Sequence, residues 1–467
     1  MLSKIKTLIY IFQLTEYDAS FFKNWAKNHP DLESYLKTKK EPVWTFKAKL
    51  IFVLAILFSP FYFIFLNKLY YSLILSSKFI KPLEMFIVFI FAQKTKSKLK
   101  RHKDLVKIGI AGSYGKTTAK EYLAAILSSK YRIFKTPENI NTLLGIIRLI
   151  LKELDENYHI LITEMAAYKK GDIKNLCKMI KPEIRILTGL NTSHLERFGS
   201  LENTIRAKFE IVDNLSQQNR VFLNADDAIV FQNYQQFFKG KPEFYGLNPE
   251  IEKVFEAKNI RVSENGLEFD IFKNKEFYFG AKTGVFGRHQ LGPILLAITV
   301  ADKLGFNKEE ILTGLRNIRP LPRRLFLKKT EARITVIDDS YNISKNSASA
   351  ALEFLKEVFP RKRKVIITAG ILEQGGKKIE NNKWLGKKIK GTADLVLMTK
   401  NSNLEFLIDG LEIPKNEILE YNERIESRKQ KAIIFDDAQE LNINLSKILK
   451  PNDVVLIFPY DLPAHYY

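Results

Sequence analysis

The chain of 467 residues is poor in cysteine, tryptophan and histidine, with one, three and six of them. Because Cys177 is the only cysteine, an intrachain disulfide is excluded and a reducing compartment is indicated. A secretory leader is excluded as well, since the segment after Leu14 is too polar and no small-residue cleavage site follows an apolar core. Internal repeats, nucleic-acid-binding motifs and basic repeats interleaved with aromatic residues are also missing, so nucleic acid is not an expected partner.

What the chain does have is an excess of positive charge. Lys and Arg number 74 against 52 Asp and Glu, and the formal net charge is +22. Such an excess suits an anionic membrane surface or an anionic, phosphate-bearing substrate. The length is sufficient for two or three domains, each with a core of its own.

The first hundred residues are the most hydrophobic part of the chain. Leu50–Leu66 carries no charge and is dense in Leu, Ile and Phe. A bilayer crossing needs about 17–20 such residues, so this segment is predicted as a transmembrane candidate. Leu69–Ala92 is apolar again but contains two lysines and a glutamate, which is typical of a poor second crossing or of a helix in the membrane interface.

A basic run follows the apolar block directly and consists of Lys94, Lys96, Lys98, Lys100, Arg101 and Lys103. The positive-inside rule places this run, and everything after it, in the cytoplasm. We therefore expect residues 1–100 to form a helical, membrane-associated region at the cytoplasmic face of the cell membrane. The alternative is a hydrophobic soluble domain.

From Val106 to about Ile318, short β-rich runs alternate with helical patterns, as in a parallel sheet covered by helices. The expected strands are Val106–Ala111, Tyr131–Lys135, His159–Thr163, Ile184–Leu190 and Arg220–Asn224, and Asn259–Gly284 is expected as a small antiparallel insertion.

Two prolines in Arg319–Pro322 mark a boundary, after which the alternation of strands and helices restarts. The expected strands are Ile334–Asp338, Val365–Ala369, Leu395–Thr399, Ile433–Phe435 and Val454–Phe458. The sequence thus predicts an α/β protein with a membrane-associated helical region (1–100), a P-loop central domain with a parallel sheet (101–318) and a Rossmann-like C-terminal α/β domain (319–467).

Within the central domain, the stretch Val106–Thr118 has the order strand, glycine loop, helix start. Such a loop turns backbone N–H groups toward a phosphate, and the helix start adds unpaired donors. The strict motif has one more glycine, where Ile110 stands here. The residues predicted to hold a nucleotide are Gly112, Ser113, Gly115, Lys116, Thr117 and Thr118, with the Thr117 hydroxyl as a ligand of Mg²⁺.

This loop alone fits a kinase, a GTPase or a ligase, and two later residues narrow the choice. Glu164 ends the third expected strand, where a carboxylate would meet the metal held by Thr117. His194 follows the fourth strand, at the sheet edge where open α/β sheets bind ligands. Lys208, on the next helix, has no function that the residues alone indicate.

Taken together, these motifs resemble the Mur ligase family, most closely its MurF type, over about Val106 to Val455. The motifs that carry the resemblance are Gly112–Thr118, Thr136–Thr142, Glu164–Ala166, Asn191–Ser200, Ala207–Glu210, Asn224–Asp227, Gly287–His289, Arg324, Asp338–Asn342 and Ala369–Gly375.

The resemblance implies an ATP-dependent carboxylate–amine ligase that works through an acyl phosphate. The implied partners are ATP, a peptide-bearing cell-wall precursor of peptidoglycan synthesis, and an amino acid or dipeptide amine such as D-alanyl-D-alanine. The resemblance also implies roles for single residues. Lys116 would bind the β- and γ-phosphates, Thr117 and Glu164 one Mg²⁺, and His194 a second Mg²⁺. Lys208 matches a lysine that relatives carbamylate, Arg324 would reach the γ-phosphate, and Asp339 and Asn342 would border the ribose or the interdomain hinge.

The chain departs from the family pattern in several places. About 100 membrane-like residues replace the domain that binds the UDP-sugar, and Gln290 stands where the family has an adenine-contacting Asn. Ser344-Lys345 replaces Asn-Pro, and Phe458-Pro459-Tyr460 replaces Lys-Gly-Ser, both near the pocket of the incoming amine. Two other hypotheses therefore stay open: a related ligase with another acceptor, such as a poly-γ-glutamyl ligase, or a nucleotide-binding membrane protein that has lost catalysis.

Overall fold

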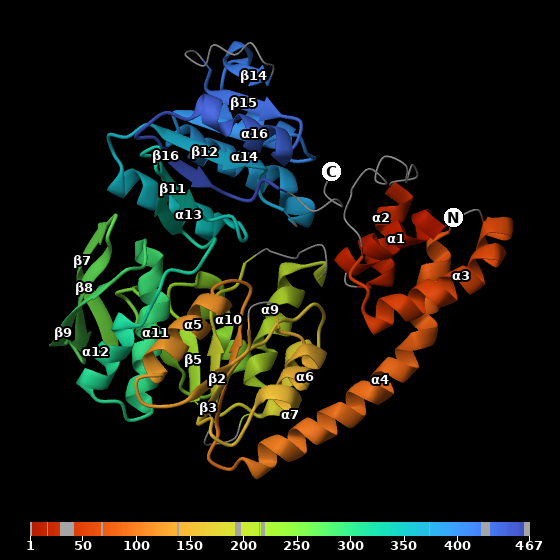
Figure 1. Ribbon diagram of the computed structural model, residues 1–467. Coiled ribbons are helices and arrows are strands. Elements are labelled where there is room, and N and C mark those ends of the chain that lie inside the picture. Colours follow the sequence, from red (N-terminus) through yellow and green to blue (C-terminus); the bar gives the residue numbers. More distant parts are fainter. Residues whose placement is uncertain are drawn as a thin grey trace. The chain divides into compact units, whose positions relative to one another are not determined.

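The computed structural model of the chain describes residues 2–15, 17–28, 42–66, 69–137, 140–191, 198–213, 215, 220–372, 374–421 and 430–461, without the side chains of residues 3, 61–66 and 375. The chain forms two compact units, one built on Met1–Gln93 and one on Lys94–Asp461. The larger unit contains two α/β domains in succession (Figure 1).

The first of these, the central domain, is built on a six-stranded sheet in the order β2-β3-β1-β4-β5-β6, and every neighbouring pair is parallel. The strands are β1 (Val106–Ala111), β2 (Ile133–Lys135), β3 (Ile160–Glu164), β4 (Ile184–Leu187), β5 (Arg220–Asn224) and β6 (Glu243–Tyr245). The helices between them are α5 (Lys116–Leu127), α6 (Leu143–Glu153), α7 (Asp172–Ile180), α9 (Leu201–Phe209) and α10 (Ala228–Phe237). The five predicted strands are confirmed, and β6 is an edge strand that the sequence pattern missed.

The apolar runs of the sequence explain why this sheet is parallel. All residues of β3 and β4 are buried, as expected of strands whose two faces are both covered by helices. Helix α5 covers one face with Leu123 and Ile126, and it packs against α11 (Leu291–Lys303), whose Leu295 is buried as well. The glycine loop before α5 is therefore fixed between a buried strand and a buried helix.

A three-stranded antiparallel sheet follows, made of β7 (Phe255–Ser263), β8 (Gly266–Lys273) and β9 (Glu276–Thr283). It confirms the predicted antiparallel insertion, and the alternating Leu267, Phe269 and Ile271 of β8 are its buried face. Helix α12 (Lys308–Arg316) contacts both β9 and α5 and starts at a capping box formed by Asn307 and Glu310.

After the Pro320–Pro322 stretch the chain folds as a second α/β domain, the C-terminal domain. Its seven-stranded sheet has the order β10-β11-β16-β12-β13-β15-β14, and only the β10–β11 pair is antiparallel. The strands are β10 (Phe326–Lys329), β11 (Thr335–Asp338), β12 (Lys364–Thr368), β13 (Leu395–Thr399), β14 (Ile418–Glu420), β15 (Ala432–Phe435) and β16 (Val454–Ile457). The helices are α13 (Lys345–Val358), α14 (Lys378–Lys390), α15 (Leu404–Leu411) and α16 (Ala438–Ile448). All five predicted strands are confirmed; β10 and β14, the two edge strands, were missed.

The smaller unit is helical and contains α1 (Leu2–Leu14), α2 (Ala19–Asn28), α3 (Phe46–Leu66) and the first part of α4 (Tyr70–Arg101). A buried cluster that includes Leu8, Phe12 and Phe22 joins these helices. Across the described residues, no helix combines the length and the apolar character that a membrane crossing needs. The transmembrane prediction for Leu50–Leu66 is therefore not supported, and the side chains of residues 61–66 lie outside the described part.

Candidate functional site

The glycine loop after β1 lies close against the end of β4, which explains its two glycines. Gly112 and Gly115 have φ angles of 147° and 81°, in the region that favours glycine. A Cβ on Gly112 would come within 2.1 Å of the Thr188 hydroxyl oxygen, so no other residue fits there. The Ser113 amide donates to the Gly189 carbonyl at 2.7 Å and ties the loop to the chain that follows β4.

Lys116, the first residue of α5, places its ammonium group over this loop. Its Nζ donates to the carbonyl oxygens of Gly112 at 2.9 Å and Ser113 at 3.2 Å. Burial lowers the pKa of Lys116; the Glu164 carboxylate opposes this effect and the Arg324 guanidinium adds to it. A cation thus lies at the helix N-terminus, where backbone donors already favour an anion.

Thr117 and Glu164 meet at the ends of neighbouring elements. Glu164 is the last residue of β3 and is 6% exposed, and its Oε2 accepts a hydrogen bond from the Thr117 hydroxyl at 3.0 Å. Among the described residues there is no group of three or more His, Cys, Asp and Glu that could hold a metal ion. One hydroxyl and one carboxylate nevertheless fit Mg²⁺, which takes few protein ligands and completes its shell with phosphate oxygens and water.

Lys120 was not identified from the sequence, although it lies one turn after Lys116 on α5. Its side chain is fully buried, and its Nζ is 3.6 Å from Glu164 Oε2 and 3.6 Å from Glu121 Oε1. A second cation therefore lies behind the carboxylate, on the same side of the helix as the phosphate loop.

A cavity of about 540 Å³ opens in front of the loop, and both α/β domains line it. From the central domain come residues 113–119 and Glu164; from the C-terminal domain come Arg324, Asp339 and Asn342. The Arg324 guanidinium donates to the Thr117 hydroxyl at 3.2 Å and lies 3.9 Å from the centre of the Tyr341 ring. The structure thus brings these predicted nucleotide-binding residues of both domains to one cavity.

Asp339 also has a structural role at this boundary. Its carboxylate accepts a hydrogen bond from the Leu325 amide at 3.0 Å, and burial raises its pKa to about 7. Leu325 and Arg323 both have positive φ angles, 50° and 60°, so the chain is sharply bent where it enters the C-terminal domain. Asp339 fixes this bend through its hydrogen bond to Leu325, and its predicted place at the ribose or the interdomain hinge stays a prediction.

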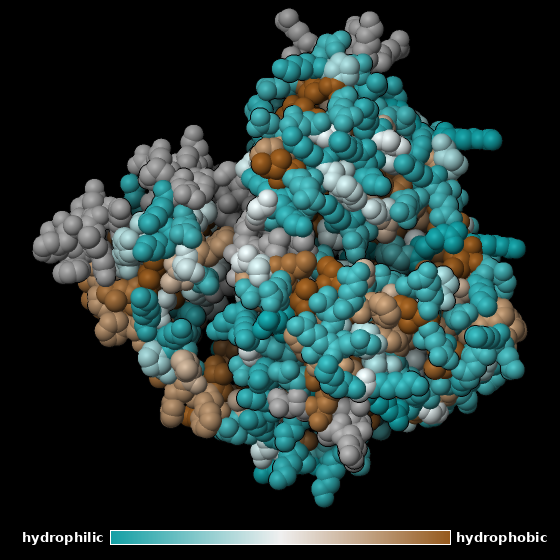
Figure 2. Space-filling model, turned by 180° about the vertical axis from the view of Figure 1, so that it is seen from behind, coloured by the Kyte–Doolittle hydropathy of each residue, from teal (hydrophilic) through white to brown (hydrophobic). Residues whose placement is uncertain are grey.

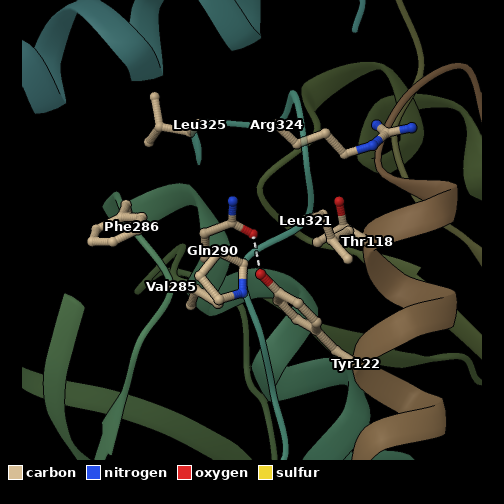
Figure 3. A pocket seen from close by; sticks show the side chains of 9 residues that line it. Thr118, Tyr122, Val285, Phe286, Gln290, Leu321, Arg324 and Leu325 are labelled. Carbon is tan, nitrogen blue, oxygen red and sulfur yellow. Dashed lines mark hydrogen bonds between the residues drawn. The ribbon is translucent and has the colours of Figure 1, made fainter. Parts of the chain in front are cut away.

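Beside the cavity lies a smaller pocket that shares Thr118, Gln290 and Arg324 with it (Figure 3). In Figure 3 the Tyr122 hydroxyl points at Gln290, and it donates to Gln290 Oε1 at 2.8 Å. The Gln290 amide nitrogen lies 3.0 Å from Nε2 of His289, whose pKa is lowered to about 4 by burial. Although Gln290 departs from the family residue, it faces the same cavity as the phosphate loop.

Tyr114 and Asn346 form a side-chain contact between the two α/β domains that the sequence did not reveal. The Tyr114 hydroxyl donates to Asp227 Oδ2 at 2.6 Å and accepts from Asn346 Nδ2 at 3.0 Å. Asp227 also caps α10 and accepts from the Leu190 amide at 2.9 Å. Tyr114 therefore connects the phosphate loop to the end of β5 and to α13 of the C-terminal domain.

Lys208 lies on α9 and is buried. Its Nζ donates to the Ala167 carbonyl at 3.2 Å and lies 5.5 Å from the centre of the Phe198 ring. Burial, with a smaller contribution from Lys116, lowers its pKa to about 7. Lys208 does not line the cavity, and His194, the predicted ligand of a second Mg²⁺, lies outside the described residues.

Both α/β domains match known families. Residues 110–301 match the Mur ligase middle domain, and residues 323–460 match the domain described as Mur ligase, glutamate ligase domain. The UDP-N-acetylmuramoyl-tripeptide–D-alanyl-D-alanine ligase of Bacillus subtilis is 28% identical over 268 residues, which are 57% of this chain and 56% of that protein. The chain thus spans little more than half the length of this relative.

Two solved structures show the same fold. A crystal structure of MurF from Acinetobacter baumannii has a TM-score of 0.68 at 22% identity. The match covers 80% of this chain and 77% of the MurF chain. The MurF ligase of Thermotoga maritima, solved in complex with ADP, has a TM-score of 0.67 at 24% identity and covers 80% of both chains. With both of its α/β domains matched to Mur ligase domains, over residues 110–301 and 323–460, the chain belongs to the Mur ligase family.

Proposed function

We propose that the chain is an ATP-dependent carboxylate–amine ligase that adds D-alanyl-D-alanine to a muramoyl-peptide in peptidoglycan precursor synthesis. The observation that carries the proposal is the contact of Thr117 with Glu164 at 3.0 Å beside Lys116, in the lining of a cavity shared by two domains. The relative from Bacillus subtilis bears the name of this activity. Because ATP is a cytoplasmic metabolite, the proposal places both α/β domains on the cytoplasmic side.

In this mechanism, the loop and Lys116 bind the β- and γ-phosphates of ATP through backbone N–H groups and one ammonium group. Thr117 and Glu164 would hold Mg²⁺, which neutralises charge on the phosphates when it is bound. The γ-phosphoryl group passes to the terminal carboxylate of the precursor, ADP leaves, and an acyl phosphate results. The amine then attacks the acyl carbon, and phosphate leaves with the C–O bond electrons.

Arg324 gives the C-terminal domain a role in the first step. Its guanidinium contacts the Thr117 hydroxyl at 3.2 Å, so in this mechanism it would lie next to the γ-phosphate. A fixed cation there would stabilise the charge that develops on the transferring phosphoryl group. Enclosure of the cavity by both domains would keep water from the acyl phosphate.

Lys208 would serve as the carbamylated lysine of this mechanism. A pKa of about 7 leaves a large fraction of its amine neutral at neutral pH, and only a neutral amine adds CO₂. The addition of CO₂ to the neutral amine forms an N–C bond, releases one proton and converts the neutral amine into an anionic carbamate. The buried carbamate would support Mg²⁺ binding together with His194.

A second candidate keeps the chemistry and changes the amine, for example to glutamate. Phe458 stands where the family has a lysine, and its side chain is fully buried in the C-terminal core. Ser344, also altered, lines the cavity and caps α13. Of these two altered positions only Ser344 lines the cavity, so the second candidate rests on the change at this position.

Mass analysis of products decides between these candidates. The full chain is incubated with ATP, Mg²⁺ and a UDP-muramoyl-tripeptide, with either D-alanyl-D-alanine or glutamate. A product heavier by one dipeptide residue, formed together with ADP, is the expected result. A product with glutamate alone supports the second candidate, and ATP binding without turnover on any pair contradicts both.

A further inference from the structure

Helix α13 of the C-terminal domain contacts the central domain at two separate places. Near the start of the helix, the Asn346 amide nitrogen donates to the Tyr114 hydroxyl oxygen at 3.0 Å. Near its end, the centre of the Phe354 ring lies 5.9 Å from that of Phe286. Phe286 belongs to the segment after β9, yet it is buried in the apolar core of the C-terminal domain. The two contacts are roughly 12 Å apart along the helix.

These two contacts differ in how easily they break. The aromatic pair is buried, and its separation would expose both rings to water. A single hydrogen bond between neutral groups changes an equilibrium only about two- to tenfold, and Asn346 is exposed. In Figure 2 the surface of both α/β domains is mostly hydrophilic, with only small hydrophobic patches between them. Domains joined in this way move relative to one another, and the contact of Asn346 with Tyr114 is the first to break when they do.

On the side of the central domain, the Tyr114 side chain is held in one position. Its ring lies against Gly189, where an added Cβ would come within 2.2 Å of the ring carbon Cζ. Its hydroxyl donates to Asp227 Oδ2 at 2.6 Å, and the same carboxylate accepts from the Leu190 and Val230 amides. Because the Tyr114 proton points at Asp227, the hydroxyl oxygen is left as an acceptor, and its partner on α13 has to be a donor.

The contact lies at the cavity, next to the loop that is proposed to bind the phosphates. Tyr114 belongs to this loop, and Asn346 to the first turn of α13. Both line the cavity, as do Ser344, the N-cap of α13, and Ala350. The hydrogen bond therefore fixes the wall that the C-terminal domain contributes against the phosphate loop. Without it, this wall is free to move away and to admit water.

We propose that Tyr114 is a positioning residue that holds the two α/β domains closed over the bound nucleotide through its hydrogen bond with Asn346. The closed arrangement keeps the Arg324 guanidinium 3.2 Å from the Thr117 hydroxyl, beside the γ-phosphate of the proposed mechanism. Opening about Phe354 breaks the hydrogen bond and lets substrates in and products out. The effect on turnover rests on the proposed function, whereas the closure itself requires only a bound nucleotide.

Energy transfer between two dyes on the full chain tests the closure without any ligation chemistry. The dyes are carried by Lys239→Cys in the central domain and Lys387→Cys in the C-terminal domain; both positions are exposed, and the buried Cys177 stays unlabelled. With Mg²⁺ and a non-hydrolysable ATP analogue, we expect Tyr114→Phe and Asn346→Ala each to lower the ratio of closed to open chains about two- to tenfold. An unchanged ratio in Tyr114→Phe overturns the proposal.

A double variant shows whether the two side chains act through one bond. Tyr114→Phe keeps the ring against Gly189 and Asn346 is exposed, so these variants are expected to fold. Tyr114→Phe combined with Asn346→Ala should lose no more than Tyr114→Phe alone, and losses that multiply overturn the proposal. Asn346→Asp should lose at least as much as Asn346→Ala, since a carboxylate has no donor.

The matched control is Glu357→Gln, near the other end of α13. Glu357 forms an ion pair with Arg288 of the central domain at 2.8 Å, and the two side chains are 38% and 49% exposed. Because exposed ion pairs contribute little, we expect the ratio of closed to open chains to stay the same. A loss equal to that in Tyr114→Phe would show that any contact of α13 serves, and would overturn the proposal.

Ligation kinetics separate this proposal from the proposed function. Tyr114→Phe should lower kcat about two- to tenfold and change KM for ATP by less than about twofold, because the backbone of the phosphate loop is intact. Asn346→Gln, which keeps an amide donor, should retain more of kcat than Asn346→Ala. An unchanged kcat in Tyr114→Phe refutes the positioning role and leaves the ligase assignment standing. Closure that Tyr114→Phe weakens, in a chain that ligates no acceptor, supports the role of Tyr114 and refutes the proposed function.

Discussion

In the central domain three charged side chains, Lys120, Glu164 and Lys208, are 0%, 6% and 3% exposed, whereas in α4 the large apolar Met85 and Phe86 are more than 60% exposed. Charged side chains are usually exposed and large apolar ones usually buried, so both regions depart from the usual distribution. The central domain buries charges, and α4 exposes apolar groups. Glu164 lines the cavity and Lys120 lies 3.6 Å behind it, and buried charges grouped in this way are typical of a catalytic centre. Exposed apolar side chains of this extent are typical of an interaction surface.

The first prediction concerns the charged side chains at the phosphate loop, which should support catalysis more than folding. Lys116→Ala should lower kcat for ATP-dependent ligation by a factor on the order of 10²–10³ or more, as found when one preorganised charge-stabilising donor is removed. ADP release measures the effect. Thermal unfolding should be nearly unchanged, and a variant that loses activity only through unfolding would undermine the contrast between the two regions.

Lys208 should make activity depend on pH. Its lowered pKa of about 7 means that the amine is neutral above that pH and protonated below it. Activity should therefore rise with pH through about 7, and Lys208→Met should lower it about 10–100-fold, as for residues that support a metal site. Lys208→Glu, which supplies a carboxylate without CO₂, should keep part of the activity. A flat pH profile in the wild type would show that Lys208 is only structural.

Lys120 should act through Glu164, as a positioning residue. Its Nζ is 3.6 Å from Glu164 Oε2, so Lys120→Met would leave the carboxylate without this cation. We expect about a tenfold rise in the Mg²⁺ concentration needed for half-maximal activity, with partial rescue in Lys120→Arg. An unchanged Mg²⁺ dependence would show that Lys120 does not position Glu164.

The smallest expected effect comes from removing one methylene group in each region. Ile162→Val in the buried β3 should lower the free energy of unfolding by about 0.5–1.5 kcal/mol, while Ile90→Val on the exposed part of α4 should change it by less than about 0.5 kcal/mol. Denaturant unfolding without lipid measures both. Equal losses would mean that the apolar part of α4 belongs to a folded core.

Features that are local in the sequence could be predicted. The loop Gly112–Thr118 is continuous, and the buried strands are continuous apolar runs, so both were found. The edge strands β6, β10 and β14 have three or four residues and are partly exposed, and no periodicity shows in so short a run.

Contacts between distant parts of the chain could not be predicted. Tyr114 and Asn346 are 232 positions apart, and only the packing of the two domains brings them together. Lys120 looks like any helix lysine until the end of β3 is placed beside it. The apolar block and the basic run that follows it directly were seen in the sequence, but that one helix, α4, contains both was not.

The central claim is that Lys116, Thr117 and Glu164 bind a nucleotide and Mg²⁺ together. Calorimetric titration of the full chain with ATP, with and without Mg²⁺, tests it most directly, in the wild type and in Glu164→Gln. We predict that Mg²⁺ tightens ATP binding at least tenfold in the wild type and has little effect in Glu164→Gln. An equal gain from Mg²⁺ in both proteins would contradict the claim.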